Sequence, residues 1–164
     1  MALGFPLLVE LTGNNCTVFG GNKSALRRVN ELLRFGAKVT VISPTICTEL
    51  EQMSAQGIIR HIPRKYFRGD CSNSQICVAA TDDSTLNIAI STECKNKGIP
   101  VNVTTPRSYG NFTFPRLAIT EDVILSITGT LPADTLNKLQ DRLQEELPAM
   151  IAELNSPSSE ESAD

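Results

Sequence analysis

Short apolar runs alternate with segments of helical period through the first two thirds of the chain. The runs expected to form strands are 16–19 (CTVF), 38–43 (KVTVIS), 58–63 (IIRHIP), 75–81 (QICVAAT) and 99–103 (IPVNV). The helices expected between them are 23–35, 45–56 and 83–97. Because this alternation is typical of βαβ units, it predicts an α/β fold with a Rossmann-like, doubly wound parallel sheet. Ligands of such sheets bind at the carboxyl ends of the strands.

The pattern changes after Pro115. Alternation in RLAITEDVILSIT, with a turn at Glu121 and Asp122, predicts an antiparallel hairpin. A helix is expected from about 134 to 147, interrupted by Pro148, with an apolar stripe formed by Leu136, Leu139, Leu143 and Leu147. This apolar surface exceeds what one small sheet covers, so we expect a homodimer. The expected domains are 1–113 (Rossmann-like), 114–154 (hairpin-helix dimerisation segment) and 155–164 (disordered acidic tail).

Composition narrows the class of protein. With 41% hydrophobic residues, 20% charged residues and a net charge of −3, the chain is typical of a globular protein without general attraction to nucleic acid or membranes. The cysteines are odd in number and widely spaced, so neither disulfides nor a zinc site is expected. They are Cys16, Cys47, Cys71, Cys77 and Cys94. The first residues lack the pattern of a signal peptide or a membrane span, so a cytoplasmic location is expected.

The turn after the first strand resembles a phosphate-binding turn. Residues 20–25 read G-x-N-x-x-A, so Asn22 stands where such turns have their second glycine. Amide N–H groups at a helix start attract phosphate, and the turn therefore either holds a diphosphate or is purely structural. No acidic residue follows the second strand, where Ser43 and Pro44 stand, so the choice between NAD and NADP stays open.

Several segments together resemble the precorrin-2 dehydrogenase family, the NAD-binding module of siroheme synthases, also described as sirohydrochlorin ferrochelatases. They are CTVFGGNKSALRRVNELLRFGAKVTVISP, CVAATDDSTLN, GIPVNV and NFTFPRLAI, within a resemblance that covers about Pro6 to Pro148. The resemblance implies NAD as cofactor, a tetrapyrrole substrate, a homodimer, and oxidation of precorrin-2 to sirohydrochlorin in siroheme biosynthesis by a diverged member. The alternative is a non-catalytic tetrapyrrole- or nucleotide-binding partner of another enzyme of that pathway.

The resemblance also implies site residues. Those at the cofactor would be Gly20, Gly21, Asn22, Lys23, Ser24, Ser43, Pro44, Thr45, Ala80, Thr81 and Asn102. Thr105 occupies the position of the family's proposed acid/base aspartate, so Asp82 is the catalytic candidate, although Asp82 and Asp83 would equally cap the next helix. Substrate carboxylates would meet Arg27, Arg28, Arg107 and Arg116, which are otherwise ordinary surface residues. No metal site and no iron insertion are predicted, because the single histidine, His61, lies among apolar neighbours in the third strand.

Overall fold

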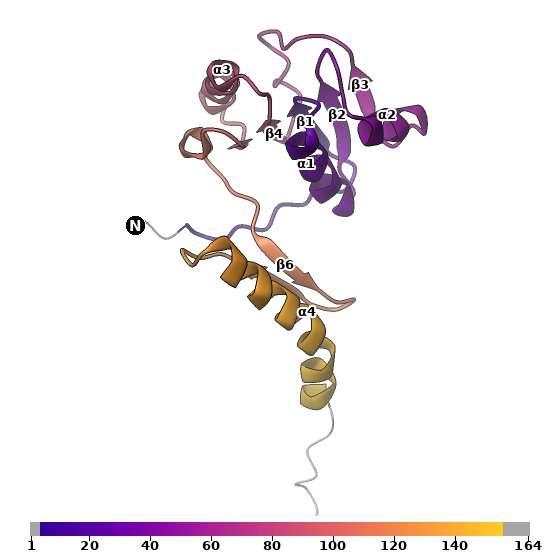
Figure 1. Ribbon diagram of the computed structural model, residues 1–164, viewed down its shortest axis with the longest axis vertical. Helices are drawn as coiled ribbons and strands as arrows, with labels where there is room; N and C mark the ends of the chain where they lie inside the picture. The colour runs from indigo at the N-terminus through magenta and orange to yellow at the C-terminus, as the bar shows by residue number, and fades with distance from the viewer. Residues whose placement is uncertain (1–3, 156–164) are drawn as a thin grey trace, which may run out of the picture. The chain divides into compact units, whose positions relative to one another are not determined.

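The computed structural model describes residues 4–155, which divide into two compact units, one ending at Thr113 and one beginning at Phe114. The first unit contains a five-stranded parallel sheet in the order β3-β2-β1-β4-β5 (Figure 1). Its strands are β1 (Asn15–Phe19), β2 (Lys38–Ile42), β3 (Arg60–Ile62), β4 (Ile76–Ala79) and β5 (Val101–Val103). Its helices are α1 (Lys23–Arg34), α2 (Thr48–Ala55), α3 (Ser84–Asn96) and a short 3₁₀ turn, η1 (Arg107–Tyr109). The expected Rossmann-like α/β fold is confirmed.

The strand order creates a crevice beside β1. The chain begins in the centre of the sheet, proceeds outward through β2 and β3, and returns to build β4 and β5 on the other side. Right-handed crossovers running in opposite directions place α1 and α3 on opposite faces of the sheet. The ends of β1 and β4 are level, since Phe19 pairs with Ala79, and the turns that follow them leave toward opposite faces. This is the position at which doubly wound sheets bind ligands.

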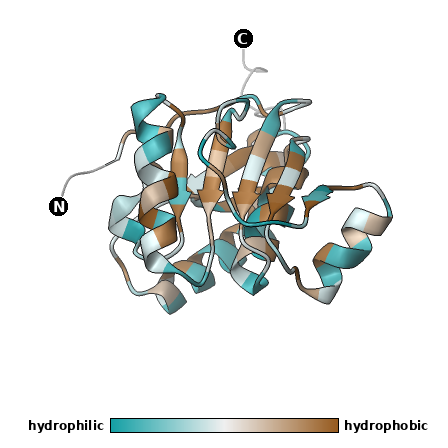
Figure 2. Ribbon diagram, turned by 90° about the horizontal axis from the view of Figure 1, so that it is seen from above, coloured by the Kyte–Doolittle hydropathy of each residue, from teal (hydrophilic) through white to brown (hydrophobic). Residues whose placement is uncertain are grey.

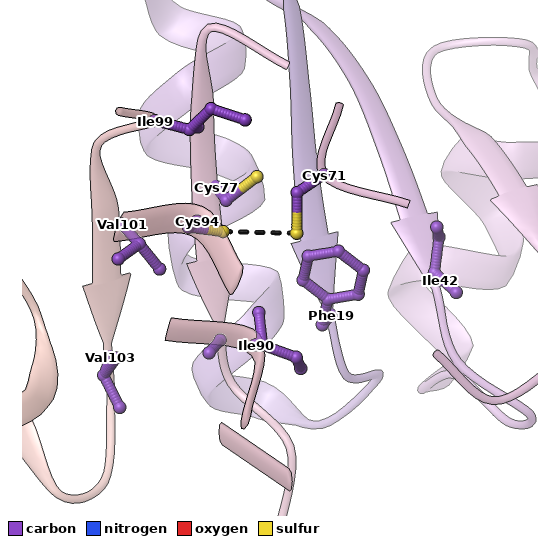
Figure 3. Packing of buried hydrophobic residues seen from close by; sticks show 10 residues of the cluster. Phe19, Ile42, Cys71, Cys77, Ile90, Cys94, Ile99, Val101 and Val103 are labelled. Carbon is purple, nitrogen blue, oxygen red and sulfur yellow. Dashed lines mark hydrogen bonds between the residues drawn. The ribbon is translucent and has the colours of Figure 1, made fainter. Parts of the chain in front are cut away.

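The core of the first unit lies on both faces of the sheet, because all four residues of β4 are buried. Figure 2 shows the central strands mostly in brown, the hydrophobic end of the scale, and the helices in mixed teal and brown. On one face Phe19, Ile42 and Ala79 belong to one buried hydrophobic cluster with Ile90 of α3. Figure 3 shows Phe19, Ile42 and Ile90 among its members. Three cysteines, Cys71, Cys77 and Cys94, belong to the same cluster.

Two helices of the first unit differ from the sequence prediction. Helix α2 begins at Thr48 rather than at Thr45, because the preceding residues pack as a loop against the turn after β1, where the Cys47 N–H donates to the Gly21 carbonyl. Helix α3 spans 84–96 rather than the expected 83–97, and in it Ala89 is exposed while Asn87 and Ser91 are buried. Their side chains make hydrogen bonds inside the unit, which turns a partly polar face of α3 toward the sheet.

The second unit consists of the antiparallel hairpin β6 (Arg116–Ile119) and β7 (Ile124–Ile127) with helix α4 (Ala133–Asn155). The helix lies along β6 (Figure 1). Two glutamines of α4 bond to the free edge of β6: Gln140 Nε2 donates to the Leu117 carbonyl, and the Gln144 amide group accepts from the Ile119 N–H and donates to the Ile119 carbonyl. The strand edge is thereby covered without a further strand.

Helix α4 corrects two predictions. It continues through Pro148 to Asn155, so the lost hydrogen bond and the steric clash that a proline causes do not end the helix. Leu136 and Leu147 are buried, whereas Leu139 is 40% exposed, so only part of the expected stripe packs against the hairpin. The expected disordered tail lies, apart from Asn155, outside the described residues. Among the residues described, no helix combines the length and apolar character needed to span a membrane.

Candidate functional site

The turn between β1 and α1 contains two glycines that fit tightly against other parts of the chain. Gly20 has a φ of +117°, and a Cβ placed on it would lie 2.6 Å from the carbonyl carbon of Ala80. A Cβ on Gly21 would lie 2.6 Å from the Cα of Ile46. Gly20 therefore lets the turn approach the backbone after β4, and Gly21 lets it approach the backbone after β2. Sequence reasoning assigned them to the ligand, but their first role is this internal contact.

Asn22 joins the two turns that border the crevice. Its Oδ1 accepts a hydrogen bond of 3.0 Å from the Ala25 N–H and so caps α1. Its Nδ2 donates to the Ala80 carbonyl at 3.1 Å and to Asp82 Oδ1 at 2.8 Å. The carboxamide is thus turned toward the loop after β4, and the backbone conformation of Asn22 is extended, with φ −84°.

The first turn of α1 offers backbone donors. Within residues 4–155, the Lys23 and Ser24 N–H groups have no hydrogen-bond acceptor, and both side chains are exposed. No acidic residue lies in this turn to compete with an anion. Free N–H groups at the positive end of a helix bind phosphate. The donor set therefore fits the diphosphate of a dinucleotide, although Asn22 has already taken the amide of Ala25.

Asn87 holds the opposite side of the crevice, and its role was not predicted. The side chain is fully buried. Its Oδ1 accepts from Thr81 N at 3.0 Å and Thr81 Oγ1 at 2.7 Å, while its Nδ2 donates to the carbonyls of Thr81 at 3.0 Å and Thr105 at 2.9 Å. It thereby links the loops that follow β4 and β5. The corresponding signal in the sequence is the last residue of the segment CVAATDDSTLN.

The two aspartates after β4 have different environments. Asp83 Oδ1 accepts from the Thr85 and Leu86 N–H groups and caps α3. Asp82 is exposed and reaches Asn22 across the crevice. Thr105 is exposed and faces the same region through its carbonyl, which accepts from Asn87. Asp82 is therefore the carboxylate that lies beside the α1 turn.

The ends of β2 and β5 complete the crevice. The buried Ser43 donates through Oγ to the Thr45 carbonyl at 2.7 Å, and its own carbonyl lies 2.9 Å from His61 Nε2. Residues 43–45 contain no acidic side chain, so they present no carboxylate to a ligand. Pro44 and Thr45 are exposed. Asn102 Nδ2 donates to the Phe112 carbonyl at 3.1 Å, whereas Asn102 Oδ1 is buried without a partner among the described residues. That oxygen is an acceptor available to a ligand.

The arginines expected to meet substrate are distributed over both units. Arg27 and Arg28 lie on α1 and pair with Glu31 at 3.4 and 2.5 Å. Arg107 is exposed at the start of η1. Arg116 belongs to the second unit, where it donates to Asn137 and to the Ala133 carbonyl. An open groove of about 420 Å³ along α1 is lined by Lys23, Leu26, Arg27, Asn30, Glu31 and Arg34, so a basic surface continues from the α1 turn.

Known proteins match most of this chain. The family model described as "Putative NAD(P)-binding" matches residues 7–116. The siroheme synthase of Thioalkalivibrio sulfidiphilus is 33% identical over 151 residues, 92% of this chain but 31% of that protein, and the siroheme synthase of Methylobacillus flagellatus is 31% identical over 91% of this chain and 32% of its own length. The chain thus spans about a third of these relatives.

A solved structure also aligns with most of this chain. "SirC, precorrin-2 dehydrogenase" aligns with a TM-score of 0.66 and 28% identity, covering 90% of this chain and 71% of that one. The expected resemblance to precorrin-2 dehydrogenases and siroheme synthases is confirmed. The match over residues 7–116 shows that the chain belongs to the NAD(P)-binding family that this model describes.

Proposed function

We propose that the chain binds NAD at the crevice between β1 and β4 and oxidises precorrin-2 to sirohydrochlorin in siroheme biosynthesis. The observation that carries the proposal is the pair of free N–H groups on Lys23 and Ser24, at the carboxyl edge of a parallel sheet. Membership of an NAD(P)-binding family and likeness to a precorrin-2 dehydrogenase support it.

The residues around the crevice have distinct tasks in this proposal. Lys23 and Ser24 hold the diphosphate through their backbone amides, and Gly20 and Gly21 let the turn sit deep enough to present them. Ser43, Pro44 and Thr45 border the adenosine ribose. Ala80, Thr81 and Asn102 lie toward the nicotinamide, where Asn102 Oδ1 is the buried acceptor for its carboxamide. When bound, the cofactor supplies the acceptor for the hydride that leaves the substrate.

The substrate is a polycarboxylate, so its position depends on cations. Arg27 and Arg28 of α1 and Arg107 of η1 are the arginines of the first unit proposed for this task, and the α1 groove places Lys23 and Arg27 together. Arg116 belongs to the second unit, and its role in substrate binding stays a prediction from the sequence. Guanidinium groups bind carboxylates through paired hydrogen bonds, which suits a substrate with several acetate and propionate groups.

The proton released in the oxidation needs an acceptor. Thr105 has no group that ionises near neutral pH, so Asp82 is the proposed base. The hydrogen bond from Asn22 fixes one oxygen of Asp82 and leaves the other oxygen for the substrate.

Cofactor binding is tested by a pair of substitutions at one position. Lys23→Pro removes the amide hydrogen while keeping a residue that helices accept at their first position, and Lys23→Ala removes only the charge. A hydrogen bond to a charged group is worth about 1.5–3 kcal/mol, so calorimetry should show NAD bound about ten- to a hundredfold more weakly by Lys23→Pro than by Lys23→Ala. Equal affinities would refute diphosphate binding at this turn.

Catalysis is tested by incubating the full chain with precorrin-2 and NAD and following the absorbance of sirohydrochlorin. Asp82→Asn should lower kcat by about 10²–10⁴, the usual loss of a general base, whereas Asp122→Asn in the hairpin turn should not. Thr105→Asp should raise kcat, because it supplies an unbonded carboxylate at the same crevice. Unchanged rates in Asp82→Asn would remove Asp82 as the base.

A second candidate function, binding without catalysis, is favoured by Thr105 itself. Saturable binding of NAD and tetrapyrrole without turnover, restored only in Thr105→Asp, would establish a non-catalytic partner of another pathway enzyme. We also propose a homodimer formed through the second unit, which sedimentation measurements test. A cytoplasmic location stays a prediction.

A further inference from the structure

Three cysteines from three different elements meet in the core of the first unit. Cys77 lies in β4, Cys94 in α3, and Cys71 in the loop between β3 and β4. All three are fully buried, and their sulfur atoms lie within 4.8 Å of one another. The Cys94 thiol donates to Cys71 Sγ at 3.2 Å, and Figure 3 shows Cys77 pointing toward the same space. We call these residues the thiol cluster.

The backbone that carries Cys71 is fixed on both sides of it. The Gly69 N–H donates to Glu93 Oε1 at 2.8 Å, and Lys97 Nζ donates to Ser72 Oγ at 2.6 Å. Glu93 and Lys97 are themselves paired at 2.7 Å and flank Cys94 along α3. These contacts tie the loop to α3 at the level of the thiols, so the cluster does not depend on the weak hydrogen bonds of the thiols themselves.

The separation of the sulfurs suits a metal ion. With metal–sulfur bonds of about 2.3 Å, three sulfurs around a trigonal ion lie about 4 Å apart, inside the limit that the cluster satisfies. Small movements of the side chains are then enough for three bonds. We propose that Cys71, Cys77 and Cys94 form a three-coordinate site for a soft monovalent ion, Cu(I).

The ligand set and its surroundings select Cu(I) over other thiophilic ions. Thiolate ligands favour Cu(I), zinc and iron–sulfur clusters. Structural zinc takes four ligands and iron–sulfur clusters take four cysteines, whereas among the described residues no histidine, aspartate, glutamate or further cysteine joins these three. The three cysteines belong to a buried hydrophobic cluster that includes Phe19, Ile90 and Val101.

The site shares no residue with the proposed dinucleotide crevice, so it stands or falls independently of the proposed function.

The test is an anaerobic titration of the fully reduced, full-length chain with Cu(I) against a chromogenic Cu(I) chelator. We expect one Cu(I) per chain, with X-ray absorption showing three sulfur neighbours at about 2.3 Å. Cys77→Ser should weaken binding more than 100-fold. The matched control is Cys16→Ser, which places the same hydroxyl at another fully buried position and should retain the ion. Cys71→Ser, in a loop, provides a second ligand variant if Cys77→Ser does not fold.

Three results would overturn the assignment. The first is complete transfer of Cu(I) to the chelator by the unaltered chain. The second is loss of binding in Cys16→Ser equal to that in Cys77→Ser. The third is tighter binding of Zn²⁺ than of Cu(I), with a nitrogen or oxygen atom as a fourth ligand. A bound ion should also raise the melting temperature of the unaltered chain but not that of the Cys77→Ser or Cys71→Ser variant.

Discussion

Replacing Asn87 by leucine tests whether one buried carboxamide holds the carboxyl edge of the sheet together. The change keeps the approximate shape of the side chain but removes its donors and acceptor. Four hydrogen bonds to Thr81 and Thr105 are lost. At about 1 kcal/mol each, the sum is about 4 kcal/mol. Thr81 is half-buried and Thr105 is exposed, so water replaces some of the lost hydrogen bonds. We therefore expect the free energy of unfolding to fall by about 3 kcal/mol.

The chain contains a convenient reporter for this loss. Both of its tyrosines, Tyr66 and Tyr109, lie in the first unit, and it has no tryptophan. The Tyr66 ring packs edge-on against Phe19, with 5.4 Å between ring centroids, so its fluorescence senses the core. With a slope of about 1.5 kcal/mol per molar urea, a loss of about 3 kcal/mol moves the unfolding midpoint by about 2 M.

The matched control is Asn96→Leu, on the exposed side of the same helix, which should change stability by less than about 0.5 kcal/mol. If Asn87→Leu shifts the unfolding midpoint no more than Asn96→Leu does, the hydrogen bonds of Asn87 to the loops after β4 and β5 contribute nothing to stability. The role that we assign to Asn87 in supporting the crevice would then be wrong.

Three further predictions concern other parts of the chain. Gly21→Ala should destabilise the first unit by about 3 kcal/mol, because its Cβ would overlap the 45–46 backbone. Gly129→Ala, whose Cβ would have its nearest contact at 3.6 Å, should lower stability only slightly. Urea unfolding of both variants checks this. The Arg64 hydrogen bonds hold the pKa of Asp70 below its ordinary value. The stabilisation from these hydrogen bonds should be complete above about pH 4 and lost as pH falls through the folded-state pKa of Asp70. If the stability of Asp70→Asn falls with decreasing pH as steeply as that of the unaltered chain, the prediction is contradicted. Gln144→Ala should expose the Ile119 amide to hydrogen exchange and cost about 1 kcal/mol, while Glu145→Ala should leave its protection intact.

The sequence predicted the parts of the fold that depend on local patterns. The apolar runs around Val18, Val41 and Val78 form the strands that were expected, because strands buried on both faces need nearly continuous apolar residues. The start of α2 was misplaced because the decisive contact, between Gly21 and Ile46, joins segments far apart in the chain. The continuation of α4 past Pro148 was missed because a proline's cost alone does not determine where a helix ends.

Around the candidate site, the order of strand, turn and helix was predictable, but the long-range contacts were not. The turn at Gly20 was located correctly because a strand, a glycine pair and a helix follow one another directly. The thiol cluster could not be predicted, because Cys71, Cys77 and Cys94 have no regular spacing and only the packing of α3 and of the loop before β4 against β4 brings them together.

Asn22 shows how a departure from a glycine pattern can preserve the structure around a ligand while changing its energetics. In the usual turn the missing side chain lets phosphate approach and leaves every amide of the first helical turn available. Here the carboxamide takes the Ala25 N–H and binds the loop after β4, so the crevice is organised by the protein itself before any ligand arrives. Such organisation lowers the entropy lost on binding, but one donor fewer remains for the diphosphate. Lys23 and Ser24 must therefore supply the backbone contacts, which is why a single proline at position 23 is a sharper probe of this site than any change to its glycines.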